Sequence, residues 1–197
     1  MKTLAAVICF SALVIAFSAC SSSDKDSVKQ AQEQNKNSAI DEGISVFLTE
    51  AADARLMDIE QGKLAKAKAT SPEVKKYGER MIADQTKLLH EIRVLAASKN
   101  IVLPSTLSNR KADELEELNE KEGEAFDKKF LRMMVSDHKR DVREFEKATD
   151  FGDKDVRKFA SSYLPLIEAH LDQVRELEDA TKAKLSEHDD EADDNKK

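Results

Sequence analysis

The sequence predicts an all-α fold, a bundle of four long helices, and three observations support this prediction. The 197-residue chain has no tryptophan, only five glycines and three prolines, and such a composition is typical of helical proteins. Apolar residues recur at helical spacing along four long segments. Apolar stripes of this length are not stable in water, so each helix is expected to cover the stripes of the others.

The start of the chain has the features of an export signal. Lys2 precedes an apolar run over 4–17, and two small residues separate this run from Cys20. The run is too short to cross a bilayer as a helix. Residues 17–20 resemble the bacterial lipobox, although an aromatic residue stands where a branched aliphatic is usual. This resemblance implies a lipoprotein signal peptide over 1–19 and acyl chains such as palmitate on Cys20, whereas an ordinary secretory signal would leave Cys20 as a free thiol.

Lipid on Cys20 would attach the protein to a membrane surface, and this attachment predicts a place in the bacterial cell envelope. Ser21, rather than aspartate, follows Cys20, which resembles lipoproteins that are passed through the periplasm to the outer membrane. Cys9 would leave with the signal, so no disulfide is expected. The formal net charge of −7 argues against nucleic acid as a partner, because that affinity depends largely on clustered Lys and Arg.

The first half of the mature chain contains a tether and two long helices. Residues 20–40 are mainly polar and predict a flexible tether. The first long helix is expected over 42–69 and the second over 72–99, with Ser71 as N-cap and Pro72 at the first helical position. The predicted inward residues are Ile44, Phe47, Leu48, Ala51, Ala54, Gly62, Ala65 and Ala69, then Val74, Tyr77, Met81, Ile82, Leu88, Leu89, Ile92 and Leu95.

The second half contains a short helix, two more long helices and an acidic tail. The short, charged helix is expected near 108–120, the third long helix over 124–149 and the fourth over 153–185. Pro165 is expected to bend the fourth helix, because it removes one backbone hydrogen bond. The domain therefore spans 41–185, and the charged residues 186–197 predict a disordered acidic tail.

The connection between the second and third long helices decides the topology. The chain over 100–123 is long enough to run back along a helix of roughly 40 Å. We therefore expect two helical hairpins joined by a crossover that contains the short extra helix, which is the ferritin-like arrangement of a four-helix bundle. A plain up-down bundle with a capping helix is the alternative.

Short motifs recur along all four predicted long helices and the connection between them. They are Phe47-Leu48 with Ala51-Ala52, Gly62-Lys63-Leu64-Ala65, Ser71-Pro72-Glu73-Val74, Met81-Ile82-Ala83-Asp84, Ile101-Val102-Leu103-Pro104, Phe126-Asp127, Met134-Val135-Ser136-Asp137-His138, and Leu164-Pro165 with His170-Leu171. These motifs resemble a known family, the bacterial lipoproteins and predicted outer-membrane proteins grouped as domain of unknown function 4142. The resemblance covers roughly 45–178. It implies a ferritin-like fold and an envelope location, and it implies no reaction because the family has no established activity.

Four ionisable residues fall on the predicted inward faces, namely Asp58, His138, Asp141 and His170. Two imidazoles and one or two carboxylates from facing helices would suit zinc, copper or iron. However, the chain has no Glu-x-x-His pair of the kind that di-iron bundles use, and the family pattern places histidine where this chain has Gln85. We favour a hydrogen-bonded polar layer that fixes helix register, with no cofactor required and a transition metal as the alternative.

No catalytic motif or phosphate-binding glycine loop occurs in the sequence. The leading hypothesis is an envelope-anchored interaction or structural module that contacts the membrane through Cys20 and an unidentified envelope protein. A metal-binding bundle is the second hypothesis, and an enzyme that uses the His/Asp cluster is the third. The sequence predicts no particular oligomeric state.

Overall fold

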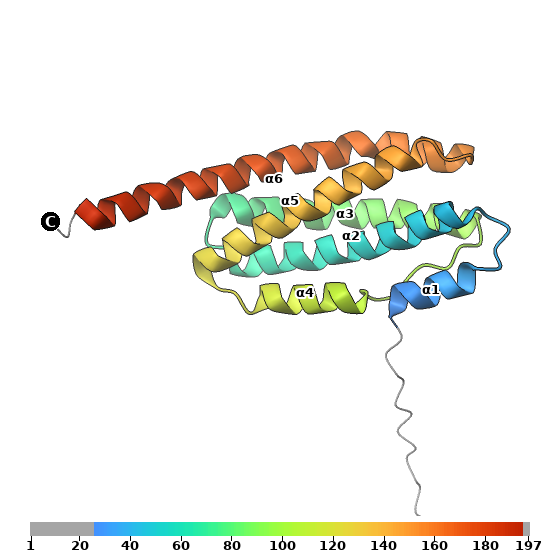
Figure 1. The fold of residues 1–197 in the computed structure, drawn as a ribbon, viewed down its shortest axis with the longest axis horizontal. Coiled ribbons are helices and arrows are strands. Elements are labelled where there is room, and N and C mark those ends of the chain that lie inside the picture. Colours follow the sequence, from blue (N-terminus) through green and yellow to red (C-terminus); the bar gives the residue numbers. More distant parts are fainter. Residues whose placement is uncertain (1–25, 195–197) are drawn as a thin grey trace, which may run out of the picture.

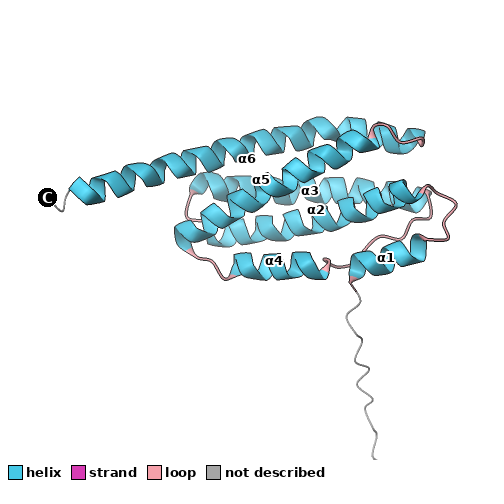
Figure 2. Ribbon diagram, viewed as in Figure 1, coloured by secondary structure: helices cyan, strands magenta, loops and turns pink. Residues whose placement is uncertain are grey.

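The structure, a computed structural model, describes residues 26–194, and it describes side chains up to residue 184. This part of the chain forms six helices and no strand, which confirms the all-α prediction (Figures 1 and 2). The helices are α1 (Ser27–Asn35), α2 (Glu42–Lys68), α3 (Pro72–Ser98), α4 (Asn109–Asn119), α5 (Gly123–Ala148) and α6 (Lys154–Asp194). The predicted signal peptide over 1–19 and Cys20 lie outside the described residues.

The four long helices pack as two hairpins. Helix α2 packs along α3 and α5 packs along α6, while α2 also contacts α5 and α3 contacts α6. The turn in the first hairpin is short because Ser71 caps α3, its hydroxyl accepting a hydrogen bond from the Val74 amide at 3.4 Å. Pro72 occupies the first turn of α3, as the sequence predicts. The first three long helices begin and end within about two residues of the predicted positions.

The connection between the hairpins runs back along the molecule through α4, so α5 begins near the α2–α3 turn (Figure 1). Two carboxylates fix this path. The Asp53 carboxylate accepts hydrogen bonds from the backbone amide and hydroxyl of Ser108, at 2.8 and 2.9 Å. The Asp127 carboxylate accepts from the Thr70 hydroxyl at 2.6 Å and from the Ser71 amide at 2.8 Å. Each carboxylate satisfies backbone donors that would otherwise lack a partner.

Part of the predicted tether is helical. Residues 27–35, expected within the flexible segment 20–40, form α1, which packs against α2 and buries Val28 and Ala31. The Asn35 side chain forms two hydrogen bonds with the backbone of Val102, donating to its carbonyl at 2.9 Å and accepting from its amide at 2.8 Å. The polar composition of this segment concealed the helix, because polar side chains make most of its contacts. Besides the Asn35 contact, the Ser27 hydroxyl accepts hydrogen bonds from the amides of Ser105 and Thr106, and the Gln32 side-chain amide donates to Thr49 and Glu50.

Helix α6 is longer than predicted. It continues through Pro165 and reaches Asp194, beyond the expected end at 185, so the segment predicted as a disordered acidic tail is helical as far as Asp194. No glycine or proline follows Pro165 to interrupt the helix. Figure 1 shows this last part of α6 running past the ends of the other long helices.

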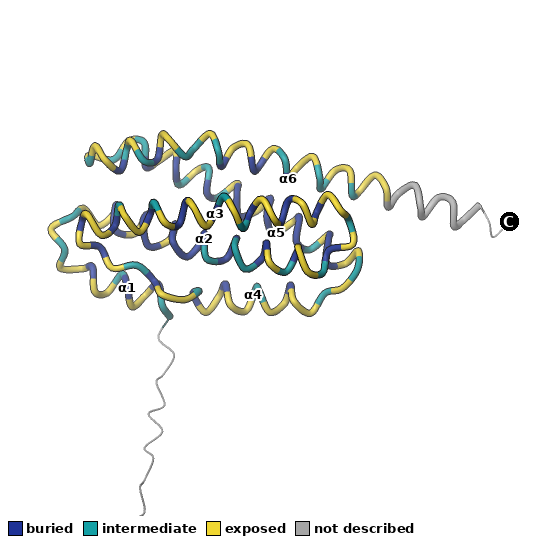
Figure 3. The backbone as a smooth tube through the Cα atoms, turned by 180° about the vertical axis from the view of Figure 1, so that it is seen from behind, coloured by how far each residue is buried: buried dark blue, intermediate teal, exposed yellow. Residues whose placement is uncertain are grey.

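Two apolar clusters fill the space between the long helices, and buried positions recur along each helix (Figure 3). One cluster contains Phe47, Leu48, Leu88, Ile92 and Phe145 among others, and the second contains Tyr77, Met81, Phe126, Phe130 and Met134 among others. On every long helix, the residues between the two clusters include buried polar side chains. The core is therefore interrupted at mid-length by a polar layer.

Candidate functional site

The polar layer combines side chains from all four long helices, and its seven principal members are less than 6% exposed. They are Arg55, Asp58 and Gln61 of α2, Gln85 of α3, His138 and Asp141 of α5, and His170 of α6. The four residues predicted from the sequence, Asp58, His138, Asp141 and His170, all lie in this layer. Their side chains point into the bundle because each residue lies on the same helical face as the apolar residues of its helix.

Arg55 lies between the two carboxylates and was not predicted. Its Nη2 atom is 3.0 Å from Asp58 Oδ2, and the same atom forms an ion pair with Asp141. Burial alone would lower the pKa of Arg55, but the charges of Asp141 and Asp58 outweigh this effect and raise it. The guanidinium therefore stays charged and neutralises carboxylates from two helices.

The two carboxylates differ in protonation. Burial raises the pKa of Asp58 to about 7, and the Arg55 charge only partly opposes this rise. Burial also acts to raise the pKa of Asp141, but nearby positive charge, that of Arg55 above all, outweighs it and holds that pKa below its ordinary value. Asp141 is therefore ionised at neutral pH, whereas Asp58 gains or loses its proton there.

His170 is bonded through both ring nitrogens. Its Nε2 atom is 2.9 Å from Asp84 Oδ2, and its Nδ1 atom is 3.4 Å from Gln85 Nε2. Burial lowers the pKa of His170 to about 4, although the Asp84 hydrogen bond opposes this shift. The neutral ring then donates from Nε2 to the Asp84 carboxylate and accepts at Nδ1 from Gln85.

His138 has one free nitrogen. Its Nδ1 atom is 3.0 Å from the Met134 carbonyl, to which it donates, so Nε2 carries the lone pair and has no partner among the described residues. Burial lowers the pKa of His138, so this ring is also neutral at neutral pH. The two imidazoles meet edge to face, with ring centroids 5.6 Å apart.

Other atoms of the layer also lack hydrogen-bond partners among the described residues. They are Nε and Nη1 of Arg55, both amide atoms of Gln61, and Oε1 of Gln85, whereas Oδ2 of Asp58 has the ion pair with Arg55 but no hydrogen bond. Each unpaired buried group lowers stability by about 1–3 kcal/mol. Each buried atom of the polar layer therefore contributes less to the stability of the folded protein than a buried atom of the apolar clusters on either side.

The geometry gives little support to the predicted metal site. Within the described residues, no group of three or more His, Cys, Asp or Glu side chains is placed to hold a metal ion. Arg55 engages Asp58 and Asp141, and Asp84 with Gln85 engages His170. Of the four predicted ligands, His138 alone presents a neutral nitrogen with no partner. Metal binding therefore stays a prediction.

The layer reaches the surface on two sides. Asp84, with 32% of its side chain exposed, lies at one end. Asp141 lines a groove of about 450 Å³ between α2 and α5. Its apolar lining residues are Val46, Phe47, Ala51, Ala54 and Phe151, and its charged lining residues besides Asp141 are Glu50, Lys111, Arg140, Glu144 and Lys147. A concave surface of this composition is a candidate contact site.

None of the helices in residues 26–194 combines the length and apolarity that a membrane span requires.

Comparison with known proteins identifies the family. No curated protein and no solved structure matches the chain. The family model described as "Domain of unknown function (DUF4142)" matches residues 27–177. This range begins at α1, contains the entire polar layer and ends within α6. Because the match covers well over half of the sequence, the chain belongs to the DUF4142 family.

Proposed function

We propose that this protein is a lipoprotein of the bacterial cell envelope whose helical domain is an interaction or structural module without catalytic activity. The observation that carries the proposal is the position of Arg55, whose guanidinium lies between Asp58 and Asp141. Catalytic carboxylates need a free oxygen facing the substrate or a water molecule. Here Oδ2 of each core carboxylate contacts the same buried guanidinium, which favours a structural role for both carboxylates.

We also propose that the fold is a ferritin-like four-helix bundle. The long connection between α3 and α5 supports this arrangement, since it runs back along the molecule and leaves α3 and α5 pointing in the same direction (Figure 1). A single long crossover between two hairpins is the topology of ferritin-like folds. The Glu-x-x-His pairs of their di-iron members are absent from this sequence.

Lipid on Cys20 is the proposed means of attachment to the membrane. Its support is the order of Lys2, the apolar run over 4–17 and Cys20. Cells grown with a clickable palmitate analogue should label the wild-type chain, and Cys20→Ala should remove the label. Cys9→Ala is the matched control and should keep it. A Cys20→Ala chain that is labelled as strongly as the wild type would contradict the proposal.

Metal binding is the alternative function, and the free Nε2 of His138 opposite the His170 ring is the observation in its favour. Calorimetric titration of residues 21–197 with copper, zinc and iron distinguishes the two functions. The structural module predicts no stoichiometric binding at micromolar concentration. A one-to-one site that His138→Ala abolishes, in a variant that keeps its helical circular dichroism, would establish the metal-binding function instead.

A further inference from the structure

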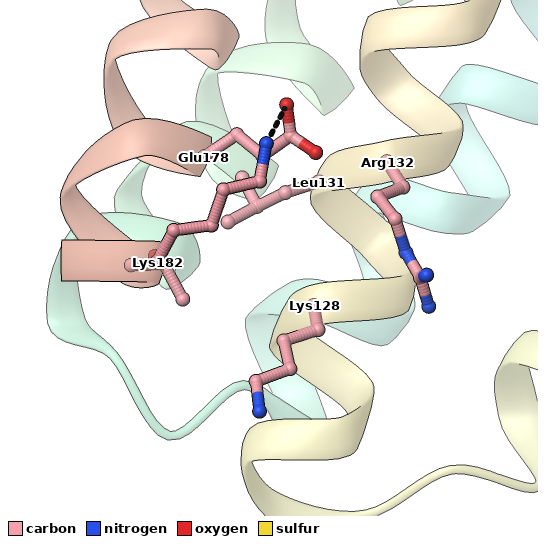
Figure 4. A pocket seen from close by; sticks show the side chains of 6 residues that line it. Lys128, Leu131, Arg132, Glu178 and Lys182 are labelled. Carbon is pink, nitrogen blue, oxygen red and sulfur yellow. Dashed lines mark ion pairs between the residues drawn. The ribbon is translucent and has the colours of Figure 1, made fainter. Parts of the chain in front are cut away.

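A second, smaller groove lies between α5 and α6, away from the polar layer. We define the α5/α6 groove by its lining, which is Lys128, Leu131, Arg132, Glu178, Thr181 and Lys182, and its volume is about 230 Å³. Figure 4 shows Lys128 and Arg132 extending from α5 on one side, with Glu178 and Lys182 on the α6 side and Leu131 between them. The groove thus has an apolar floor, a basic edge on α5 and an ion-paired edge on α6.

Within the described side chains, which end at residue 184, the basic groups on the α5 edge have no anionic partner. Lys182 is 3.0 Å from Glu178 and is neutralised, and the neighbouring Lys129 is 3.0 Å from Glu117. By contrast, Lys128 and Arg132 are exposed and form no ion pair or hydrogen bond among the described residues. They stand four residues apart on one face of α5, where like charges repel each other. This edge would be stabilised by an anion from outside the bundle.

The end of α6 is acidic, so its charge is opposite to that of the basic edge on α5. Beyond the groove, α6 continues to Asp194 and runs past the other long helices (Figure 1). Its last turns contain six acidic residues, Glu187, Asp189, Asp190, Glu191, Asp193 and Asp194. At about 1.5 Å per residue, a helix end of this length extends far enough to reach a neighbouring molecule.

We infer that the α5/α6 groove is the docking site for the acidic end of α6 from a second copy of this chain. If two α6 helices pair antiparallel about residue 185, residues 188–192 of each copy lie level with 178–182 of the other, where the groove is. Each copy then contributes one basic groove and one acidic helix end. Such a two-fold contact is self-complementary and closed. The inference rests on the proposed interaction module and names a partner for it.

An anionic membrane is a poorer occupant of the same groove. The acidic end of α6 follows the groove on the same helix, and the whole chain has a formal net charge of −7. An anionic membrane is broad and would face these carboxylates as well as Lys128 and Arg132, whereas a single helix end can be placed against Lys128 and Arg132 alone. The charge pattern therefore favours the acidic helix of another copy.

Sedimentation equilibrium of residues 21–197 tests the inference, since this chain keeps every described residue. We expect a dimer at about 0.05 M salt and a dissociation constant at least about tenfold higher at 0.5 M, because exposed charges are screened by salt. A chain that stays monomeric at about 0.05 M salt and high micromolar concentration overturns the inference. If the monomer instead sediments with vesicles containing anionic phospholipid, the groove is a lipid site.

Charge reversal gives a sharper test. One variant reverses the charge of the groove, K128E/R132E, and another reverses four acidic residues of the helix end, E187K/D190K/E191K/D194K. Each variant alone should be monomeric at the concentration where wild type is dimeric, because groove and helix end then carry the same sign. An equal mixture should form a heterodimer, because each groove again meets a helix end of opposite charge. A monomeric mixture overturns the inference.

K139E/R143E is the matched control. Lys139 and Arg143 are also exposed and four residues apart on α5, but they do not line the groove. This variant should remain dimeric, and a monomeric K139E/R143E chain would show that net charge, and not the groove, controls assembly. Circular dichroism checks that all variants are folded. Palmitate labelling at Cys20 is unaffected by these changes, so a monomer that is labelled would refute the dimer while leaving the proposed envelope lipoprotein intact.

Discussion

Arg55 is the residue on which the arrangement of the core depends most. Its side chain is fully buried and contacts Asp58 on its own helix and Asp141 on α5. Removing one partner from a buried ion pair leaves an uncompensated charge in a medium that solvates it poorly. The guanidinium therefore ties α2 to α5 at mid-length, and changes to it should affect stability before they affect any surface property.

Folding raises the pKa of Asp58 and lowers that of His170, and these opposite shifts predict how the stability of the protein depends on pH. Folded Asp58 keeps its proton up to about pH 7, while an unfolded aspartate loses its proton near pH 3.8. The contribution of Asp58 to the free energy of unfolding is therefore lost as pH rises from 3.8 towards 7. Folded His170 has a pKa of about 4, whereas an unfolded histidine has a pKa of 6.5, so between these values only the unfolded state is protonated. The contribution of His170 to the free energy of unfolding is therefore lost as pH falls from 6.5 towards 4. Between pH 4 and 6.5 the two effects oppose each other.

Asp58→Asn should remove one of these opposing effects. The free energy of unfolding should then rise with pH, between 4.5 and 6.5, more steeply than in wild type by roughly 1 kcal/mol per pH unit. Urea denaturation at several pH values measures the slope. The exposed Asp113→Asn is the control and should keep the wild-type slope. If Asp58→Asn also keeps that slope, folded Asp58 is ionised throughout this range.

Part of this site could be predicted from sequence and part could not. Asp58, His138, Asp141 and His170 could be placed inside because they share helical faces with apolar residues. Arg55 was missed because arginine is rarely fully buried, and because Asp141 is 86 residues away in the chain. Its position three residues before Asp58, on the same face, was the one local signal.

At the scale of elements, two glycines determine how closely α2 and α3 pack. A Cβ atom added to Gly62 would lie 2.7 Å from the Gly78 carbonyl oxygen, and one added to Gly78 would lie 2.7 Å from the Ala65 Cβ. Gly62 could be assigned to the inward face from helical spacing, whereas Gly78 could not, since its role depends on the residues of α2 opposite it. Likewise, α1 depends on Asn35 meeting Val102, a contact between distant parts of the chain.

Gly78→Ala should destabilise the protein. In an isolated helix the same change would stabilise by roughly 1 kcal/mol, but here the new methyl group is forced against Ala65 and the Gly62 carbonyl. Overpacking of this kind costs about 1–3 kcal/mol. Gly152→Ala is the control, since an added Cβ there meets no atom within 4 Å. Thermal or urea unfolding compares the two variants. A Gly78→Ala chain more stable than wild type would mean that α2 and α3 can move apart without a loss of stability.

At the scale of the whole molecule, the chain builds two apolar clusters separated by one charged layer. The number of long helices and the return path between hairpins could be predicted, because stripe lengths and the length of the 100–123 connection limit the choices. The helical end of α6 could not be predicted from the sequence, because its acidic composition is equally typical of disordered tails. The layer crosses all four long helices, so it is the feature best placed to fix their register.

A double-mutant cycle between Arg55 and Asp141 tests this account most directly. Arg55→Met alone should lower the free energy of unfolding by about 3–5 kcal/mol, and Asp141→Leu should also be destabilising, because each leaves a buried charge without its partner. The double variant Arg55→Met/Asp141→Leu should lose less than the sum of the two by at least about 2 kcal/mol, measured by urea denaturation. Losses that add to within about 0.5 kcal/mol would contradict a core held in register by this buried pair.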